Sequence, residues 1–467
     1  MNKTVFERQP AAESVIRNAL EGSVNRPFWG DDAGAKKQFA SLAGEVESDL
    51  LIVGGGFLGL WTAILAKERD PSCKVVLLEG KRVGWAASGR NGGFCEASIT
   101  HGDEIAERRW PEEAAQLERI GQENLEEMDA TIKRYGIDCD FERTGVLVVA
   151  VEPYQDDLLR AGDEYMSAAE VRAEVDSPTF LSAHWERDST AMLHPGKLVA
   201  GLLRVADELG VKIYEESLAT QLKSAGKRMR VKTAGGSVTA TRVVLATNAF
   251  PSLLKRFRLH TVPVYDYALM TKPLSDSQLE SIGWKNRQGI ADMGNQFHYY
   301  RITKDNRILF GGYDAIYNFG GKIDPQHDDR TESFQHLASN FFCTFPQLEG
   351  VSFSHRWGGV IDTSTRLCAF YAQAFGGKVA YAAGFTGLGV GATRFAANVL
   401  LDKIHGLDTE RTRLRMVREI PLPFPPEPLA YASIRAAQWA LKKADRNNGK
   451  RNFLLRAMDA VGLGFDS

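Results

Sequence analysis

Residues 49–60, DLLIVGGGFLGL, place a G-x-G-x-x-G motif directly after a short apolar run. The apolar run is typical of a buried parallel strand, and residues 61–70, WTAILAKERD, have helical periodicity. A second apolar run ends in Glu79, twenty residues beyond the motif. Such glycines permit a tight turn, close approach of the backbone to a pyrophosphate and close helix–strand packing. The sequence therefore predicts a dinucleotide site, with the pyrophosphate at the helix N-terminus and Glu79 on the ribose.

Two further glycine-rich segments indicate which dinucleotide binds. Residues 82–94, RVGWAASGRNGGF, offer flexible backbone with polar side chains, as suits a large planar ligand. Residues 379–393, VAYAAGFTGLGVGAT, read as a strand and glycine loop before another helix N-terminus, where negative charge is stabilised. A cofactor held at both ends fits FAD better than NAD. No second G-x-G-x-x-G occurs between residues 140 and 380, so we expect hydride to reach flavin N5 directly from a substrate.

Composition excludes several other classes of protein. The chain has 467 residues, enough for two or three domains, and its net charge of −2 gives no reason to expect a nucleic-acid partner. No apolar run reaches the length of about 18 residues of a membrane span, and the first residues lack the apolar core of a signal peptide. The five cysteines form no CxxC pair, which disfavours a metal site or a disulfide framework. We expect a cytoplasmic protein without a bound metal.

The motifs together resemble the D-amino-acid-oxidase and glycine-oxidase superfamily of FAD-dependent oxidoreductases. Within it, the chain looks most similar to the γ-glutamylputrescine-oxidase-like branch. The resemblance rests on VGGGFLGLWTA, Glu79, ASGRNGG, LHPGKL, RVVLATNAF, RWGG and AAGFTGLGVG, which span residues 26–428 with their surroundings. It implies an α/β fold, in which a Rossmann-like FAD-binding domain is joined to a discontinuous antiparallel-sheet substrate domain.

The resemblance also implies which residues contact FAD. Most belong to the three glycine-rich segments, and the remainder meet the adenine or the ribose: Gly54, Gly56, Phe57, Leu58, Gly59, Glu79, Gly80, Ser88, Gly89, Arg90, Asn91, Gly92, Gly93, Ala219, Thr247, Asn248, Gly384, Thr386, Gly387, Leu388 and Gly389. Backbone N–H groups of Gly387, Leu388 and Gly389 would face the flavin pyrimidine edge. Non-covalent binding is expected, with Cys95 as the alternative covalent tether.

Two positions depart from the pattern of the family. Gly391 stands where sarcosine-oxidase-like members of the family carry a lysine over the flavin. Arg366 stands near the position of the aspartate that commonly follows the WGG motif in this family. Both departures leave open the substrate and the electron acceptor, which could be O2 or another molecule.

For the substrate site, the resemblance implies a tyrosine at Tyr299 and a residue near the substrate at Asp314, which could balance an ammonium group. Strand alternation puts Arg301 on the same face as Tyr299. Arg301 and Arg356 are candidate anchors for a carboxylate or phosphonate, with structural salt bridges as the alternative. Two tyrosines, Tyr265 and Tyr267, are candidates for lining the pocket. Two histidines, His298 and His355, are candidate bases near neutral pH. Each of the four could instead have a structural role.

The strand-rich and proline-rich stretches suggest how the chain divides. We expect an N-terminal leader (1–45), an FAD-binding domain (46–135, 184–262 and 355–410) and a substrate domain (136–183 and 263–354), whose strands should form antiparallel hairpins. Residues 411–467 form a proline linker and a basic helical extension with eight arginines and three lysines against five acidic residues. This extension could contact the protein's own acidic body, a partner subunit in a homodimer, an acidic electron-acceptor protein or a membrane surface.

Three functions fit these features. The first is FAD-dependent oxidation of a primary or secondary amine to an imine, which hydrolyses to an aldehyde and a smaller amine; polyamine conjugates and aminophosphonate-like amines fall in this class. The second is an amino-acid oxidase or dehydrogenase, which requires an arginine pointing into the pocket. The third is a peripheral electron-transfer flavoprotein that uses the basic extension.

Overall fold

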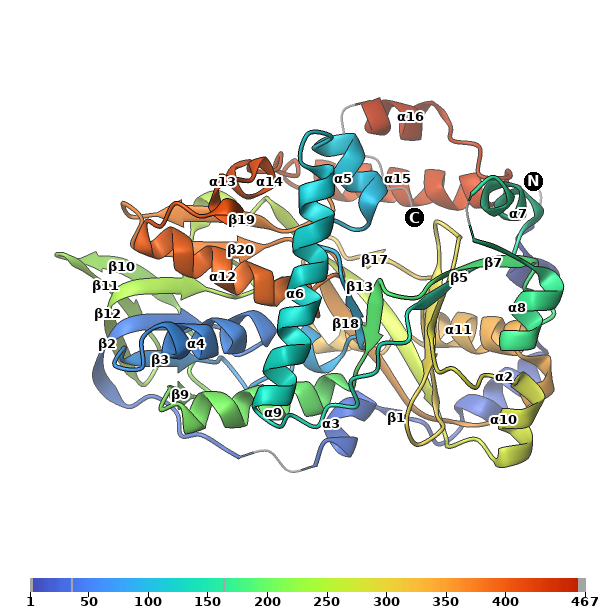
Figure 1. Cartoon of the computed structure of the whole chain (residues 1–467), viewed down its shortest axis with the longest axis horizontal. Coiled ribbons are helices and arrows are strands. Elements are labelled where there is room, and N and C mark those ends of the chain that lie inside the picture. Colours follow the sequence, from blue (N-terminus) through green and yellow to red (C-terminus); the bar gives the residue numbers. More distant parts are fainter. Residues whose placement is uncertain (1–2, 35–36, 163, 461–467) are drawn as a thin grey trace.

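The computed structural model describes residues 3–34, 37–162 and 164–460. Two large sheets lie side by side along the longest axis of the molecule (Figure 1). The first is mostly parallel and carries the glycine motifs, and the second is mostly antiparallel. The expected α/β fold with two kinds of sheet is confirmed.

The first sheet has eight strands. Its main path runs in the order β10 (Gln221–Ala225), β11 (Arg228–Lys232), β12 (Gly236–Leu245), β2 (Gly44–Val53), β3 (Val75–Leu78) and β9 (Lys212–Tyr214). Strand β20 (Val379–Ala383) pairs parallel with β12 and antiparallel with β19 (Phe370–Ala374). The expected strands around the first and last glycine motifs are confirmed.

Side-chain alternation on β2 shows how this sheet is buried on both faces. Leu50 and Ile52 belong to the core that includes α4 (Phe57–Arg69), α9 (Pro195–Glu208) and α12 (Ala392–His405), whereas Leu51 and Val53 belong to the core of the opposite face. Successive strand residues point to opposite faces, so both alternating sets must be apolar. Burial of both faces explains the continuous apolar run.

The second sheet has ten strands. Its path is β1 (Val24–Asn25), β18 (Phe353–Ser364), β13 (Thr261–Thr271), β16 (Ile308–Gly312), β15 (His298–Ile302), β14 (Gly289–Asp292), β5 (Val146–Ala150), β7 (Ser182–Glu186) and β6 (Tyr165–Ser167), with β17 (Ile316–Tyr317) beside β13. The expected hairpin within residues 295–315 is confirmed, since β15 and β16 pair antiparallel. Strand β5 differs from the expected hairpin pattern, because it pairs parallel with β14 and antiparallel with β7.

Strand pairing places two segments differently from the expected domain division. Residues 353–364 pair along almost the whole of β13, and residues 184–186 pair with β5, so both segments belong to the ten-stranded sheet. The domain division expected from the sequence assigns residues 355–364 and 184–186 to the FAD-binding domain. The motif RWGG therefore lies inside the second sheet, and the chain crosses to the first sheet only afterwards.

The remaining elements surround the two sheets. A small sheet pairs β4 (Phe94–Glu96) with β8 (Thr190–Met192). The other helices are α1 (Val5–Arg8), α2 (Glu13–Leu20), α3 (Phe28–Asp32), α5 (Asp103–Arg109), α6 (Ala114–Arg134), α7 (Pro153–Arg160), α8 (Ala168–Glu174), α10 (Asp276–Ile282), α11 (Thr331–Thr344), α13 (Glu410–Arg413), α14 (Arg415–Arg418), α15 (Leu429–Asp445) and α16 (Phe453–Ala460), with 3-10 turns at Ala87–Gly89, Lys255–Phe257, Pro325–Asp328 and Pro346–Leu348.

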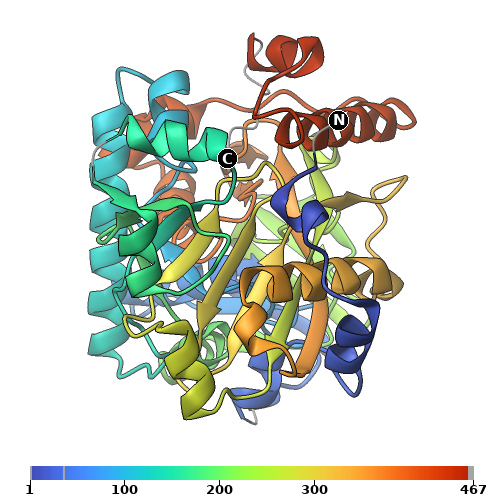
Figure 2. The ribbon, with the colours of Figure 1, turned by 90° about the vertical axis from the view of Figure 1, so that its right-hand side faces the viewer.

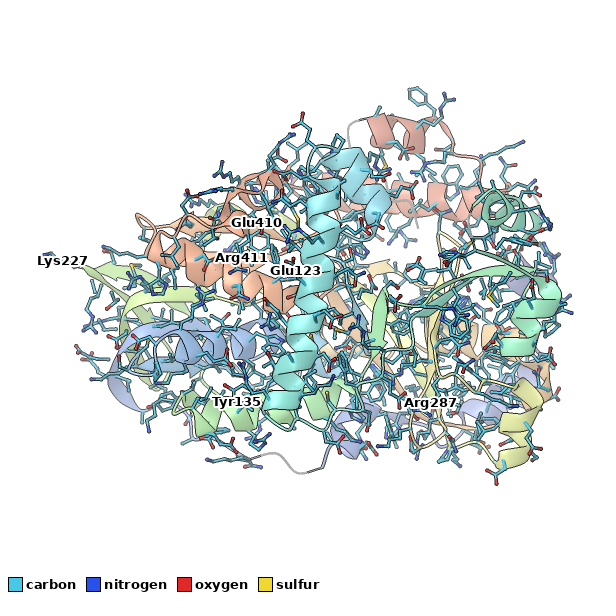
Figure 3. The ribbon with its side chains drawn as sticks, in the orientation of Figure 1. Glu123, Tyr135, Lys227, Arg287, Glu410 and Arg411 are labelled. Atoms are coloured by element: carbon cyan, nitrogen blue, oxygen red, sulfur yellow. The ribbon has the colours of Figure 1, made fainter. Side chains whose placement is uncertain are left out.

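Helix α6 crosses the front of the molecule and contacts α12 and α5. Arg119 on this helix pairs with Glu123 of the same helix and with Glu410 at the start of α13, and Figure 3 labels both acidic partners. Arg411 pairs with Asp402 at the end of α12. The pairs with Glu410 and Asp402 fasten the chain beyond α12 to α6 and to α12 itself.

The C-terminal extension packs on its own chain. Arg446 pairs with Glu7 of α1, and Figure 2 shows the N-terminal segment beside α15. Tyr317 donates a hydrogen bond to Glu427. Packing on the protein's own body was one of the expected arrangements, and these contacts confirm it. In the described part of the chain, no helix is both long and apolar enough to cross a membrane.

Candidate active site

A cavity of about 1970 Å³ lies where the carboxyl ends of the parallel strands face the ten-stranded sheet. Val53, Leu78 and Ala246 line it at the ends of β2, β3 and β12. Ligand pockets commonly measure about 300–1,000 Å³, so this cavity has room for a large cofactor and a substrate. Carboxyl ends of parallel strands are also where ligands bind in open α/β sheets.

The first glycine motif forms one end of the cavity. Gly54 has a left-handed φ of 113°, and a Cβ there would meet the carbonyl oxygen of Ala246 at 2.3 Å. A Cβ on Gly59 would meet the carbonyl oxygen of Gly54 at 1.9 Å, so α4 can lie this close only with glycine. The N-terminus of α4 is thereby held at the cavity wall, where its N–H groups favour an anion.

Glu79 lies beside this helix start and is buried. It accepts hydrogen bonds from the N–H groups of Gly55 and Lys81, at 2.8 and 2.9 Å, and from the indole of Trp85 at 3.1 Å. Burial raises the pKa of Glu79, although these hydrogen bonds oppose the rise. The carboxyl group is thus fixed at the cavity wall, as a ribose-binding acid requires.

The loop before β4 contributes backbone more than free side chains. Ser88 Oγ accepts the N–H of Phe57 at 2.9 Å and joins the loop to the start of α4. Asn91 accepts the N–H of Gly93 at 3.0 Å and shapes the turn. Arg90 donates to Asp328 at 2.8 Å and is therefore already engaged across the two sheets.

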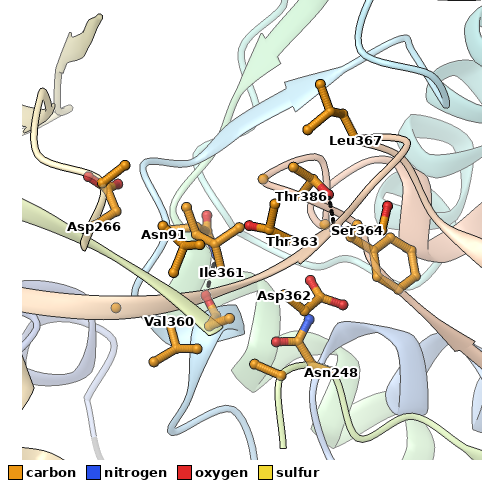
Figure 4. A pocket seen from close by; sticks show the side chains of 18 of the residues that line it. Asn91, Asn248, Asp266, Val360, Ile361, Asp362, Thr363, Ser364, Leu367 and Thr386 are labelled. Atoms are coloured by element: carbon orange, nitrogen blue, oxygen red, sulfur yellow. Dashed lines mark hydrogen bonds between the residues drawn. The ribbon is translucent and has the colours of Figure 1, made fainter. Parts of the chain in front are cut away.

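The last glycine loop is held by residues that the sequence reasoning missed. Asp362 on β18 accepts the N–H of Gly384 at 2.6 Å, and Figure 4 shows it beside Asn248. Burial raises the pKa of Asp362 to about 7, although its hydrogen bonds oppose the rise. His101 contacts the carbonyl oxygen of Thr386 at 2.6 Å, and burial lowers the pKa of this histidine. The neutral imidazole of His101 can donate a hydrogen bond to the Thr386 carbonyl. This bond holds the glycine loop just before the N-terminus of α12.

Of the 21 residues expected to contact FAD, sixteen line this cavity: Gly54, Gly56, Phe57, Leu58, Glu79, Gly80, Ser88, Arg90, Asn91, Gly92, Ala219, Thr247, Asn248, Thr386, Gly387 and Gly389. Five lie behind the wall instead: Gly59, Gly89, Gly93, Gly384 and Leu388. Gly59, Gly89 and Gly93 permit close packing against neighbouring backbone, and Gly384 permits close approach of the Ser364 side chain. Leu388 is buried in the core, and its N–H donates to the carbonyl of Phe385 at 3.1 Å rather than into the cavity.

The wall fits FAD on chemical grounds. Thr247 lines the cavity with a polar side chain at the end where the ribose is expected. A Cβ on Gly56 would meet Ser88 Oγ at 2.9 Å, so the narrow passage beside α4 is kept open by glycine. Cys95 is fully buried near Met128 and lies outside the cavity lining, and burial raises the pKa of its thiol. The arrangement therefore gives no support to the covalent alternative at Cys95.

Tyr299 lines the other side of the cavity. There it contacts an acidic residue that the sequence analysis did not identify. Its hydroxyl donates to Asp266 of β13 at 2.6 Å, and Asp266 also accepts the N–H of Tyr267 at 2.7 Å and interacts with the N–H of Gly312. Burial raises the pKa of Asp266 to about 6, although these hydrogen bonds oppose the rise. A single charged residue in the aromatic stretch VPVYDYALM was the available sequence signal.

Asp314 also borders the cavity, but its carboxylate is already occupied. It accepts hydrogen bonds from Ser333 at 2.6 Å, Arg330 at 3.1 Å and His336 at 3.2 Å. Burial would raise the pKa of Asp314, but these hydrogen bonds and charges lower it below its ordinary value. Its charge is balanced by Arg330, the residue before α11, and its oxygens are already bonded to Ser333 and His336 of that helix.

The two candidate arginine anchors do not line the cavity. Arg301 is 2% exposed and donates to the carbonyl oxygen of Leu193 at 2.5 Å; burial lowers the pKa of Arg301 to about 10. Arg356 donates to Ser23 and lies 3.5 Å from Asp329. Strand alternation correctly placed Arg301 on the Tyr299 side, but its longer side chain reaches past the cavity and fastens the loop at Gly93. These contacts give no support to Arg301 as a catalytic residue or substrate anchor and favour its structural alternative.

The remaining candidates divide between cavity and core. Tyr265 and Tyr267 line the cavity, and their hydroxyls donate to the carbonyl oxygens of Asp324 and His327. His298 is fully buried between Asp292 and Asn340, and His355 contacts Asp31 and Ser354. Neither histidine lines the cavity. Across the described residues, no group of three or more His, Cys, Asp and Glu side chains could hold a metal ion.

Comparison with known proteins supports the cofactor. Residues 49–402 match the model of the FAD dependent oxidoreductase family, which covers most of the chain. The chain belongs to this family. It is thus an FAD-dependent oxidoreductase, and the family match ends before the C-terminal extension.

Among curated relatives, the γ-glutamylputrescine oxidoreductase of Escherichia coli is 31% identical over 404 residues, covering 82% of this chain and 89% of that protein. A probable oxidoreductase OrdL of Haemophilus influenzae is 28% identical over 402 residues, covering 83% and 89%. Among solved structures, the glycine oxidase of Geobacillus kaustophilus has a TM-score of 0.67 at 18% identity, covering 80% of this chain and all of that one. This last likeness shows a shared fold.

Proposed function

We propose that the protein oxidises a primary or secondary amine at its C–N bond to an imine, which water converts to an aldehyde and a smaller amine. Asp266 is the observation that carries this proposal. Its carboxylate lies at the cavity wall, and its described contacts are a tyrosine hydroxyl and two backbone N–H groups rather than a cation. A carboxylate among tyrosines suits a substrate ammonium group.

The charge of the whole cavity wall supports a cationic substrate. Twelve carboxylate residues line the cavity, against three lysines and arginines. Of those three, Lys81 lies over Trp85, Arg90 is paired with Asp328, and Arg258 donates to the carbonyl of Ser252. An amino-acid oxidase needs a cation for the substrate carboxylate, and Arg301 and Arg356 point elsewhere. We therefore favour an amine without an α-carboxylate over an amino acid.

The residues of the chain would then divide the work as follows. Gly56, Ser88 and Glu79 would hold FAD, which supplies the two-electron acceptor for hydride from the carbon beside nitrogen. Asp266 would bind the ammonium group and take its proton, because only the neutral amine can become an imine. Tyr299 would keep the carboxylate aimed into the cavity. No arginine or catalytic triad is required.

The name of the Escherichia coli relative supports the class of substrate, since γ-glutamylputrescine is an amine.

Gly391 bears on the electron acceptor. A Cβ there would meet the carbonyl oxygen of Glu96 at 2.4 Å, so the lysine of sarcosine-oxidase-like members has no space. We leave O2 and another acceptor as alternatives. A cytoplasmic location and a homodimer stay predictions, and the packed extension gives the electron-transfer hypothesis no support.

The test compares Asp266→Asn with Asp314→Asn. We expect Asp266→Asn to raise KM for cationic amines about tenfold to a hundredfold, the range for losing a hydrogen bond to a charged group, at unchanged FAD content. Asp314→Asn should change KM little and lower thermal stability, because that carboxylate holds the start of α11. A rise of KM in Asp314→Asn alone would place the ammonium site there instead.

An anaerobic titration of the holoenzyme tests the reaction class directly. Amines, amino acids and aminophosphonates are added in turn while the visible flavin band is followed, and air is then admitted. We expect amines to bleach the flavin. Bleaching by amino acids alone, or by NADH alone, would contradict the proposal, and the rate of recolouring in air would separate an oxidase from a dehydrogenase.

A further inference from the structure

Part of the cavity wall comes from the C-terminal extension, beyond the end of the family match at residue 402. Helix α15 lines the cavity at Ile434, Ala437 and Leu441, and α16 lines it at Leu454 and Met458. The first three are spaced three and four residues apart, which puts them on one face of the helix. The two helices thus form an apolar wall, which we call the roof.

Ser433, Ala436 and Gln438 also border the cavity from α15, at the edges of this face. Leu441 and Met458 pack against the small core of Ala440, Ala444 and Leu455. The roof is therefore a packed helix pair with its own core, and its apolar side chains have a defined position.

Two contacts fix the roof to the substrate side of the cavity. Asp445 accepts hydrogen bonds from Asn295, at 2.9 Å from the backbone and 2.6 Å from the side chain, and from the N–H of Gln296 at 3.1 Å. Gln438 donates to the carbonyl of Ala315. Both attachment points belong to loops that flank β15 and β16, and both loops line the cavity.

The second attachment lies close to the proposed ammonium site. Gly312 interacts through its N–H with Asp266, and Ala315, which holds Gln438, follows three residues later. Three residues span at most about 11 Å, so the attachment point of α15 lies no farther than that from Gly312, and both regions line the same cavity. An amine held by Asp266 therefore has apolar helix surface within reach of its other end.

We propose that the roof forms a subsite for the hydrocarbon body of the amine, and that it selects substrates with an alkyl or aryl chain distal to the reacting nitrogen. This inference rests on the proposed amine oxidation. The carboxylate binds one end of the molecule and the roof excludes water from the other. Selectivity for chain length then resides in a segment that lies outside the family match.

The test uses n-alkylamines from propylamine to octylamine with anaerobic holoenzyme, and measures both Kd by calorimetry and kcat/KM by flavin bleaching. Burial of each methylene should tighten binding roughly threefold to fourfold until the roof is filled. Ala437→Trp fills the subsite, so the increase in affinity with chain length should disappear, while propylamine should still bind. Ala432→Trp adds the same bulk on the exposed side of α15 and serves as the matched control.

Leu441→Ser is a second variant. It should reduce the increase in affinity for each added methylene without adding bulk to the roof. The roof subsite would be overturned if affinity depended on chain length equally in wild type, Ala437→Trp and Leu441→Ser. It would also be overturned if the affinity of the wild type did not change with chain length. Amines that bind with the expected length dependence but never bleach the flavin would support the subsite and overturn the proposed reaction. Absence of all amine binding would overturn both.

Discussion

At the scale of single residues, Asp266 and Asp314 show that position alone does not make a substrate ligand. Both carboxylates border the cavity, but Asp314 is neutralised by Arg330 and bonded to Ser333, whereas Asp266 has only uncharged donors among its described contacts. The difference appears in the opposite directions of their pKa shifts. In the proposed function, Asp266, the carboxylate without a cationic partner among the described residues, is therefore the one that binds the ammonium group.

The pH dependence of amine binding follows from Asp266. Burial raises its pKa to about 6, so the carboxylate form that binds a cation is lost as pH falls through that value. The amine remains protonated, since alkylammonium groups titrate near pH 10. Between about pH 8 and about pH 5 the affinity for an alkylamine should therefore decrease, by about tenfold per pH unit at the acid end. Calorimetric titration measures this, and a matching decrease in Asp266→Asn would assign it to another group.

At the scale of elements, the sequence was most informative where local rules act. The glycine turns, the helices after them and the 295–315 hairpin could all be predicted, because each depends on neighbouring residues. The parallel pairing of β5 with β14 could not, since it joins segments more than a hundred residues apart. Asp362 and His101 were missed for the same reason: each acts on the loop at 384–386 from another element.

Attachment of α15 is an element-level property that one residue tests. Asp445→Ala removes the acceptor for the hydrogen bonds from Asn295 and Gln296 and leaves these donors unpaired, at a cost of about 1–3 kcal/mol. We expect α15 to detach more often and trypsin to cleave it faster, with FAD retained. Asp459→Ala is the matched control, because it breaks a pair with Arg451 within the extension. Equal cleavage of both variants would contradict this role of Asp445.

At the scale of the whole molecule, the cavity is the interface between the two sheets. Its wall takes Gly56 and Glu79 from the first sheet region and Tyr299 and Asp266 from the second, while Arg90 crosses to Asp328. A ligand that fills this space contacts both halves at once. FAD should therefore stabilise the fold as a whole, beyond the elements that hold its phosphates.

Gly56→Val tests this coupling. The valine side chain would displace Ser88 and obstruct the passage beside α4, so we expect apoprotein with a lower Tm. Stabilisation by a ligand at a thousandfold excess over Kd is about 4 kcal/mol, and the wild-type apoprotein should regain it on adding FAD. Calorimetry and flavin absorbance provide the measurements. Gly30→Val, where an added Cβ meets nothing within 4 Å, is the control; normal FAD content in Gly56→Val would refute the assignment.

The ion pair between Glu7 and Arg446 has a consequence for biosynthesis. It joins α1 to the end of α15, two segments whose paired residues are 439 positions apart in the sequence. Strand β2 likewise needs β12, and β12 needs β20, before the cofactor end of the cavity is closed. We therefore expect FAD to bind only after these long-range pairings have formed. Chains truncated before β20 should therefore be colourless, because they lack the strand and the glycine loop that complete this end of the cavity.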